Sequence, residues 1–213
     1  MPELLRKIID DRTLYAIWKI SESVEELRSA IKLRGSEELL YNSFVAESRQ
    51  KQWLAYRILI RELLKPDEIP VEYDVSGKPY LAGSDFHISV THTDDLAAVI
   101  ISLHGRVGID IEKIRPRIEK VRDKFISMEE DRLIGKDREL EQLTLAWCAK
   151  EALYKLFGIR NLDFRENMLV KIPAQAGMTF IAIICFGGKK HIYRMHSKLI
   201  GSYILVYLME PAI

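Results

Sequence analysis

Residues 107–112, Val-Gly-Ile-Asp-Ile-Glu, constrain the fold of this chain more than any other segment. The apolar residues are typical of a strand, and side chains along a strand alternate between its faces, so Asp110 and Glu112 point the same way. Two carboxylates side by side repel each other and resist burial, and a bound cation is the simplest way to relieve that repulsion. An edge strand with its acids in water would show the same pattern, although the flanking Val and Ile residues favour a buried strand.

The hydrophobic pattern along the chain predicts an α+β fold with two similar halves, residues 1–104 and 105–213. We expect strands at residues 13–20, 86–91, 96–103, 107–112, 168–172, 178–186, 189–196 and 199–208. We expect helices at residues 23–33, from 36 onward, and at 48–64, 118–125, 127–134 and 139–157. The short connection 104–106 predicts that the strands on either side of it form a hairpin. No letter-level repeat relates the halves, so any likeness between them is one of shape.

The composition is that of a soluble globular protein, with 48% hydrophobic and 30% charged residues. A net charge of +1 argues against a nucleic-acid coat or a membrane-binding surface, and no apolar run reaches the ~20 residues of a membrane helix. The first residues lack an apolar signal core, so we expect a cytoplasmic protein. Cys148 and Cys185 lie in apolar contexts without metal-ligand spacing, so we expect buried, reduced thiols and no structural zinc.

The longest expected helix, residues 139–157, carries Lys150, Glu151 and Lys155 among many apolar residues. A helix that is apolar over most of its surface is largely buried, so these charges need a polar gap in the protein. A surface pair of Glu151 and Lys155 is the simpler alternative and would contribute only roughly a few tenths of a kcal/mol. The acid pair on residues 107–112 needs a third ligand, and Mg²⁺ binds carboxylates together with substrate phosphate oxygens. The two segments together therefore indicate a magnesium site that handles phosphate.

Two further groups of residues could bind phosphate. His92 ends a strand between Thr91 and Thr93, and all three side chains can donate hydrogen bonds, although a capped strand end would look the same. Arg49 and Arg57 are eight residues apart on one helix, which places them on roughly the same face. They could hold a phosphomonoester, or they could simply form a solvated face.

The segment that follows the acid pair, residues 113–124, is strongly basic. It contains six Lys and Arg residues against Glu119 and Asp123, a net charge of +4 over twelve residues. Such a segment can be a solubilising face, or it can attract an acidic partner and raise the rate of encounter.

Five motifs in this order resemble those of the 4′-phosphopantetheinyl transferases, specifically the larger, surfactin-synthetase-type class. They lie between about Arg49 and Lys155 and comprise Gly77-Lys78-Pro79, residues 86–93 (Phe-His-Ile-Ser-Val-Thr-His-Thr), residues 107–112, residues 125–130 (Phe-Ile-Ser-x-x-Glu) and residues 147–155 (Trp-x-x-Lys-Glu-Ala-x-x-Lys). His87 and Thr91 replace the family's usual Asn and Ser, and both keep polar character.

The resemblance implies two related α+β halves packed about a pseudo-twofold axis, with the active cleft between them. It implies a Mg²⁺-dependent enzyme that moves the phosphopantetheine arm of coenzyme A onto a serine of an apo acyl or peptidyl carrier protein and releases adenosine 3′,5′-bisphosphate. It also implies a role in fatty-acid or secondary-metabolite synthesis, an acidic carrier as partner, and a monomer.

The same resemblance assigns roles to single residues. Asp110, Glu112 and Glu151 would hold Mg²⁺, and Lys155 would neutralise charge on the transferring phosphate. Glu130 would take the proton of the serine, with Glu151 as the alternative base. The residues that would bind coenzyme A are Arg49, Arg57, Lys78, Thr91, His92 and Lys155.

Two other functions fit parts of this pattern. A metal-dependent nuclease or phosphohydrolase also needs clustered acids and a lysine, but Lys113 follows Glu112 directly and would point to the other face, and the near-neutral charge lacks the basic stripe of a polyanion-binding protein. A non-catalytic coenzyme A-binding module of the same fold would have no chemical reason to retain every acid.

Overall fold

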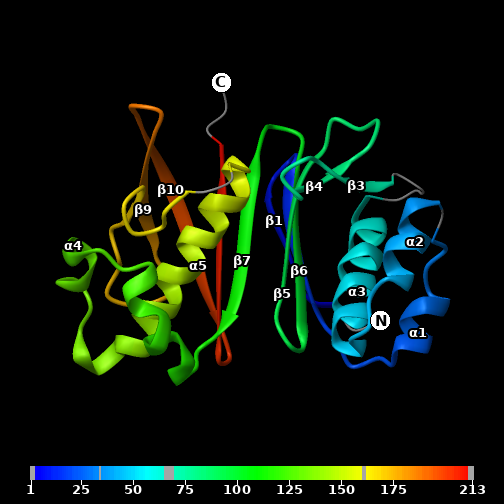
Figure 1. The fold of residues 1–213 in the computed structure, drawn as a ribbon, viewed down its shortest axis with the longest axis horizontal. Helices are drawn as coiled ribbons and strands as arrows, with labels where there is room; N and C mark the ends of the chain where they lie inside the picture. The colour runs from blue at the N-terminus through cyan, green and yellow to red at the C-terminus, as the bar shows by residue number, and fades with distance from the viewer. Residues whose placement is uncertain (1–2, 34, 65–69, 160–161, 211–213) are drawn as a thin grey trace. The chain divides into compact units, whose positions relative to one another are not determined.

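The computed structural model describes residues 3–33, 35–64, 70–159 and 162–210 of the 213-residue chain. The chain divides into two compact units, Met1–His104 and Gly105–Ile213, whose helices and strands are shown in Figure 1. Each unit combines an antiparallel sheet with helices, which confirms the expected α+β class. No helix in the described ranges is both long and apolar enough to cross a membrane.

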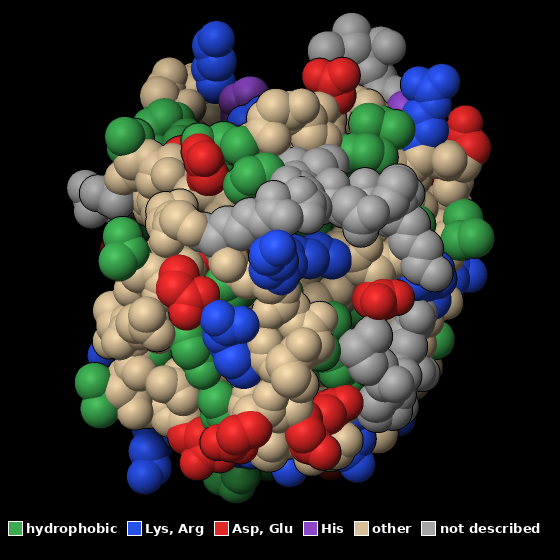
Figure 2. Space-filling view, turned by 90° about the vertical axis from the view of Figure 1, so that its right-hand side faces the viewer, with side chains coloured by type: hydrophobic (Ala, Val, Ile, Leu, Met, Phe, Trp, Pro, Cys, Tyr) green, Lys and Arg blue, Asp and Glu red, His purple; other side chains and the backbone are tan. Residues whose placement is uncertain are grey.

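The main sheet of the N-terminal unit has the strand order β1-β2-β6-β5, and neighbouring strands are antiparallel. The elements of this unit are β1 (Glu3–Asp10), β2 (Thr13–Lys19), α1 (Val24–Ser29), α2 (Ser36–Asn42), α3 (Glu47–Leu64), β3 (Val71–Tyr73), β4 (Pro79–Leu81), β5 (His87–His92) and β6 (Leu96–Ser102). α3 packs its buried Trp53, Leu54 and Ile58 against the sheet, in which β6 is buried along its whole length. The helical side of this unit shows acidic and basic side chains intermingled, with hydrophobic side chains in small groups (Figure 2).

The sheet of the C-terminal unit has the order β7-β11-β10-β9-β8 and is also antiparallel throughout. The elements of this unit are β7 (Val107–Lys113), the 3-10 helix η1 (Pro116–Lys124), α4 (Met128–Asp131), the 3-10 helix η2 (Lys136–Arg138), α5 (Glu139–Phe157), β8 (Met168–Val170), β9 (Thr179–Phe186), β10 (Lys189–Ile200) and β11 (Tyr203–Met209). α5 has the bounds that the sequence predicts. It ends where Gly158 takes the left-handed conformation (φ 67°) and donates its N–H to the carbonyl of Tyr154.

Gly108 allows the backbone of α5 to lie directly against β7. A Cβ atom at this position would be 2.0 Å from the backbone oxygen of Ala152, a distance that no side chain can tolerate. Because side chains alternate along β7, Gly108, Asp110 and Glu112 all face α5, opposite the core residues of β11. This close approach brings the acid pair of the strand next to the polar side chains of the helix.

Some elements differ from the sequence-based expectation. The expected hairpin between strands 96–103 and 107–112 is wrong, because β6 pairs with β2 and β5, whereas β7 pairs with β11 over seven residues. The α-helix expected at residues 118–125 is instead the 3-10 helix η1, which ends at Lys124, and β1, β3 and β4 were not expected. Cys148 is buried as expected, but Cys185 is exposed because it points away from the face of β9 that α5 covers.

Candidate active site

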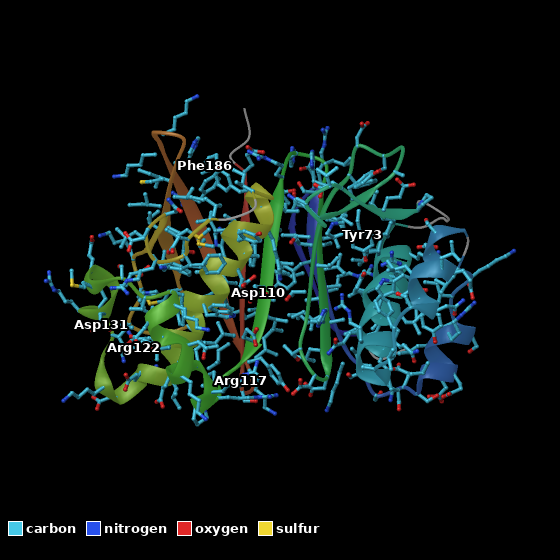
Figure 3. All side chains as sticks on the ribbon, viewed as in Figure 1. Tyr73, Asp110, Arg117, Arg122, Asp131 and Phe186 are labelled. Carbon is cyan, nitrogen blue, oxygen red and sulfur yellow. The ribbon has the colours of Figure 1, made fainter. Side chains whose placement is uncertain are left out.

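Asp110 is buried on β7, on the face that packs against α5 (Figure 3). Lys155, in the last turn of α5, donates from Nζ to Oδ1 of Asp110 at 2.7 Å and to the backbone carbonyl of Ile109 at 3.2 Å. The side chain of Lys155 is 27% exposed, against 5% for that of Asp110. The pair therefore joins the strand to the helix at a point that solvent can reach from the lysine side.

Glu112 and Glu151 add two carboxylates to the surroundings of Asp110. Burial, and then the charge of Asp110, raises the pKa of Glu112 to about 7, although a hydrogen bond from the Trp147 side chain opposes the rise. Burial and then Asp110 also raise the pKa of Glu151, against the attraction of Lys155. Three acids thus act on one another around a single lysine. Such an excess of negative charge in a partly buried position is what a divalent cation would neutralise.

The three acids influence one another electrostatically, but their carboxylate oxygens do not all lie close together. Across the four described ranges, Asp110, Glu112 and Glu151 are not a set whose carboxylate oxygens lie within 4.8 Å of one another, whereas Asp10, Asp11 and His104 are such a set. The latter group is partly exposed, and Arg12 lies 3.7 Å from Asp11, so we assign it no role. Mutual repulsion favours rotamers that separate the acids of β7 and α5, and the two glutamates have the side-chain freedom to rotate.

Glu130 and Lys150 form a fully buried ion pair within the same unit. Lys150 donates from Nζ to Oε2 of Glu130 at 2.7 Å and to the carbonyls of Phe125 and Phe164, among others. The other oxygen of Glu130 accepts the backbone N–H of Val170 at 2.7 Å, and Oε2 also closes the capping box of α4. Both carboxylate oxygens therefore bind the protein itself.

In the N-terminal unit, the candidate phosphate-binding residues fall into two groups. The exposed Arg49 of α3 donates to Nε2 of His92 at the end of β5 at 2.7 Å, so two residues 43 positions apart meet. Lys78 lies half-buried in the turn between β3 and β4. Arg57, by contrast, is 1% exposed, and Thr91 is buried as well.

Comparison with known proteins shows which protein family this chain resembles. Residues 106–208 match the model of the 4′-phosphopantetheinyl transferase superfamily. This segment, which is slightly less than half of the chain, is therefore similar to the 4′-phosphopantetheinyl transferases. The chain is 34% identical to 4′-phosphopantetheinyl transferase AcpT of Salmonella typhimurium over 117 residues, which span 52% of this chain and 60% of that relative. It is 25% identical to 4′-phosphopantetheinyl transferase HetI of a Nostoc species over 75% of each chain, and 26% identical to psf-1 of Bacillus pumilus over 64% of this chain and 62% of that one.

The superfamily match covers the acid cluster of β7 and α5 together with the ion pair of Glu130 and Lys150. Glu130, which the resemblance made the expected base for a serine, lies inside the core of the C-terminal unit. A base must reach the proton that it removes, and Glu130 is 0% exposed with both oxygens bound by the protein. Its role in this structure is to anchor α4 and β8 to α5.

Arg57, an expected ligand of coenzyme A, is buried as well. Its guanidinium group donates to Glu37, to the Tyr56 and Tyr73 hydroxyls and to the backbone carbonyl of Val71, and it lies over the ring of Trp53. With these donors committed inside the core, Arg57 stabilises the unit. Thr91, another expected ligand of coenzyme A, is 4% exposed.

The basic segment 113–124 is only partly available to a partner. Arg122 binds Asp131 and Glu139, and Figure 3 shows Arg122 beside Asp131 and away from Arg117. Lys120 and Lys124 are exposed on η1 together with Arg117. These three residues are the ones that could meet an acidic surface.

Sequence reasoning missed the contribution of two residues that flank the acid cluster. Trp147 hydrogen-bonds Glu112, and Cys148 is buried close to the same charges, so that burial and then Asp110 and Glu112 raise the pKa of its thiol well above the usual range. A tryptophan one turn before Glu151 was visible in the sequence, but its partner depends on how α5 is rotated over β7.

Proposed function

We propose that this protein is a 4′-phosphopantetheinyl transferase, which moves the phosphopantetheine arm of coenzyme A onto a serine of an apo carrier protein. The observation that carries the proposal is the cluster of Asp110, Glu112 and Glu151 around Lys155, inside the segment that matches the superfamily. The serine oxygen attacks the phosphorus that bears the pantetheine arm, the pyrophosphate bond breaks, and adenosine 3′,5′-bisphosphate leaves.

The donor set of the cluster fits Mg²⁺, because it offers only carboxylate oxygens, the ligands that this hard ion prefers. Asp110, Glu112 and Glu151 would hold the ion. When bound, it would offset the negative charge of the pyrophosphate during transfer. The raised pKa of Glu112 supports this assignment, since a cation is what would keep that carboxylate ionised near neutral pH.

Side chains of the protein would neutralise charge on the phosphoryl group, remove the proton of the serine and bind coenzyme A. Lys155, held by Asp110 and partly exposed, would neutralise charge on the transferring phosphoryl group. Glu151, directly or through a water molecule, replaces Glu130 as the proposed base, because it belongs to the cluster whereas Glu130 is buried. Arg49 and His92, which contact each other, would bind a phosphate of coenzyme A with Lys78.

A repeated chain path supports the proposal of two related halves. In the N-terminal unit, β2 leads through α3 to β5 and β6, and β6 returns to pair antiparallel with β2. In the C-terminal unit, β7 leads through α5 to β10 and β11, and β11 returns to pair antiparallel with β7. We propose that these paths are the two members of a pseudo-twofold pair.

Intact-protein mass spectrometry tests the proposed function. Incubation with coenzyme A, Mg²⁺ and an apo carrier protein should convert the carrier to a species heavier by one phosphopantetheine group. The matched control is the same carrier with its acceptor serine replaced by alanine, which should keep its mass. No conversion of any member of a panel of fatty-acid, polyketide and peptide carriers at high protein concentration would overturn the proposal. An acidic carrier should also react more slowly with an Arg117→Glu/Lys120→Glu variant.

The pKa of Glu112 predicts how stability depends on pH. In the native state the pKa of this side chain is about 7, so it keeps its proton up to that pH, whereas in the unfolded chain it ionises near the ordinary glutamate pKa of 4.5. Between these values the native state binds more protons than the unfolded state, so the free energy of unfolding falls as pH rises. Glu112→Gln should therefore be more stable than the parent at pH 8 by roughly 1–2 kcal/mol, after allowance for screening by solvent, and equal to it near pH 4.

Thermal unfolding at both pH values in the presence of a chelator measures this difference. The exposed Glu129→Gln is the matched control and should follow the parent at each pH. Addition of MgCl₂ at pH 8 should raise the melting temperature of the parent and not that of Glu112→Gln. Equal stability of the parent and Glu112→Gln at pH 8 would show that the ionised carboxylate of Glu112 does not destabilise the folded state.

A further inference from the structure

The face of the C-terminal sheet that points away from α5 carries an apolar row on its outer strands. Leu169 of β8 lies opposite Ile183 of β9, which in turn lies opposite Ile192 of β10. Ile192 is 58% exposed, Ile183 and Leu169 are half-buried, and Ile181 lies on the same face of β9 with 37% exposed. Neighbouring strands are about 4.8 Å apart, so the three aligned residues form a stripe roughly 10 Å long across the sheet.

Positive charges flank this row on β10, and the two acids that line the pocket beside it, Glu129 and Glu166, are paired with Lys171 and Arg165. Residues 168–209, which contain β8 to β11, include five Lys and Arg residues and no Asp or Glu. Lys190 lies opposite Cys185 and Arg194 lies opposite Ile181, so both cations stand on the same face as the apolar row, one on each side of Ile192. A surface of this kind is complementary to a partner that is apolar along its centre and acidic along its edges.

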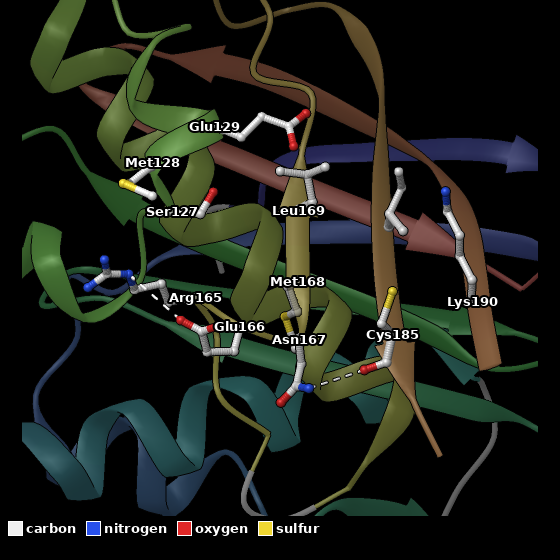
Figure 4. Close-up of a pocket in the computed structure, with 11 residues that line it drawn as sticks. Ser127, Met128, Glu129, Arg165, Glu166, Asn167, Met168, Leu169, Cys185 and Lys190 are labelled. Carbon is white, nitrogen blue, oxygen red and sulfur yellow. Dashed lines mark hydrogen bonds and ion pairs between the residues drawn. The ribbon is translucent and has the colours of Figure 1, made fainter. Parts of the chain in front are cut away.

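A pocket of about 430 Å³ lies at one side of the row (Figure 4). Its lining includes Leu169, Ile183 and Lys190 together with Met128, which is 74% exposed, and Cys185. In Figure 4, Cys185 and Lys190 lie on adjacent strands, and the strand with Met168 and Leu169 lies between them and the segment that holds Met128 and Glu129. A pocket of this size can accept a large apolar side chain, which a flat surface cannot do.

This face is distinct from the acid cluster. Asp110 and Glu112 point toward α5, whereas the apolar row lies on strands β8 to β10 and points to the opposite side of the sheet. Phe186, at the tip of the β9–β10 hairpin, is also far from Asp110 in Figure 3. A partner bound to the row would therefore not contact the residues proposed for transfer.

We propose that the row Leu169–Ile183–Ile192, with Lys190 and Arg194 on either side, is a docking face for an amphipathic helix with acidic flanks, presented by a partner protein. A helix offers apolar side chains at i, i+3, i+4 and i+7 along one stripe and carboxylates beside it, which matches the pattern of the face. A second copy of this chain is disfavoured, because a symmetric contact would set Lys190 and Arg194 against the same cations of the other copy. The pocket beside the row favours a protein side chain over a bilayer surface.

Binding of a synthetic helix tests the proposal without relying on the proposed activity. The probe is a fluorescein-labelled 18-residue peptide with leucines at i, i+3, i+4, i+7 and i+11 and glutamates on both flanks, titrated with the full chain and followed by fluorescence anisotropy. Lys190→Glu/Arg194→Glu should weaken binding by about tenfold or more, since each exposed charge pair contributes up to about 1 kcal/mol. Ile192→Ser should weaken it as well, and 300 mM salt should weaken binding to the parent more than to the charge-reversed variant.

Matched controls separate the alternatives. Lys32→Glu/Lys136→Glu reverses two exposed cations elsewhere and should bind the peptide as the parent does. Equal affinity for a lysine-flanked peptide, or unchanged binding by both docking-face variants, would overturn the proposal. So would sedimentation with phosphatidylserine vesicles in the absence of peptide binding, or a concentration-dependent dimer that Ile192→Ser abolishes. Phosphopantetheine transfer to a free carrier should proceed at the parent rate in Lys190→Glu/Arg194→Glu, which keeps this test independent of the proposed function.

Discussion

Replacement of Asp110 by asparagine should reduce transfer of phosphopantetheine by about a thousandfold and leave the fold intact. The substitution keeps the shape of the side chain and removes the charge that holds Lys155 and would hold Mg²⁺. Loss of one group that stabilises charge in a transition state typically costs about 10²–10³ in rate, and here two such contributions are affected.

The stability of this variant should not fall with its activity. Asp110 raises the pKa of both Glu112 and Glu151, so its removal relieves repulsion within the cluster. The partly exposed Lys155 can turn to solvent when it loses its partner. Circular dichroism should therefore show a melting temperature equal to that of the parent or higher, while intact-protein mass spectrometry shows no conversion of the carrier on the time scale of the parent.

The exposed Asp137→Asn provides a matched control, which should transfer at the parent rate. Full activity of Asp110→Asn would remove Asp110 from the metal site and with it the main support for the proposed function. Loss of activity together with loss of the folded state would be separated by the melting curves.

The second large effect concerns the buried ion pair. Glu130→Ala should lower the free energy of unfolding by about 3–5 kcal/mol, because it leaves the charge of Lys150 buried without its carboxylate partner. The N–H of Val170 would lose its acceptor at the same time. Urea unfolding measures the loss. The double variant Glu130→Leu/Lys150→Met, which removes both charges, should recover a large part of it.

The exposed pair of Glu129 and Lys171 offers a control on the neighbouring surface. Glu129→Ala should change stability by less than about 1 kcal/mol, as is usual for an ion pair in solvent. A comparable loss in both single variants would contradict the structural role that burial assigns to Glu130.

The double variant also decides whether Glu130 is a base. If Glu130 only anchors α4 and β8, Glu130→Leu/Lys150→Met should retain transfer within about tenfold of the parent at a temperature where both are folded. Loss of a general base would instead lower the rate by about 10²–10⁴. A folded but inactive double variant would restore Glu130 to the catalytic set.

Several features of this chain could be read from local sequence. α5 has the predicted bounds because its apolar pattern, its length and Gly158 all act over a few neighbouring residues. The capping box of Ser127 and Glu130 is likewise a local hydrogen-bond pattern, formed by residues three apart in the chain. The alternation that places Asp110 and Glu112 on one face is a property of any strand.

The features that sequence reasoning missed depend on contacts between distant residues. Only a short connection separates β6 from β7, yet β6 pairs with β2 and β7 pairs with β11. Strand pairing depends on contacts with strands that are distant in the sequence. Glu130 and Arg57 looked like exposed functional groups, and both have every oxygen or nitrogen engaged inside a core. No local pattern distinguishes a buried, satisfied charge from a catalytic one.

The sequence by itself determined the α+β class, the bounds of the central helix and the presence of two acids on one strand face, because helix and strand periodicity and capping are decided by neighbouring residues. Only the tertiary structure decided which charges act together. The approach of α5 to β7 at Gly108 sets Lys155 against Asp110, and Glu130 forms its ion pair with Lys150 inside the core. Burial and charge neutralisation depend on the surroundings in three dimensions, and those surroundings are assembled from residues far apart in the chain.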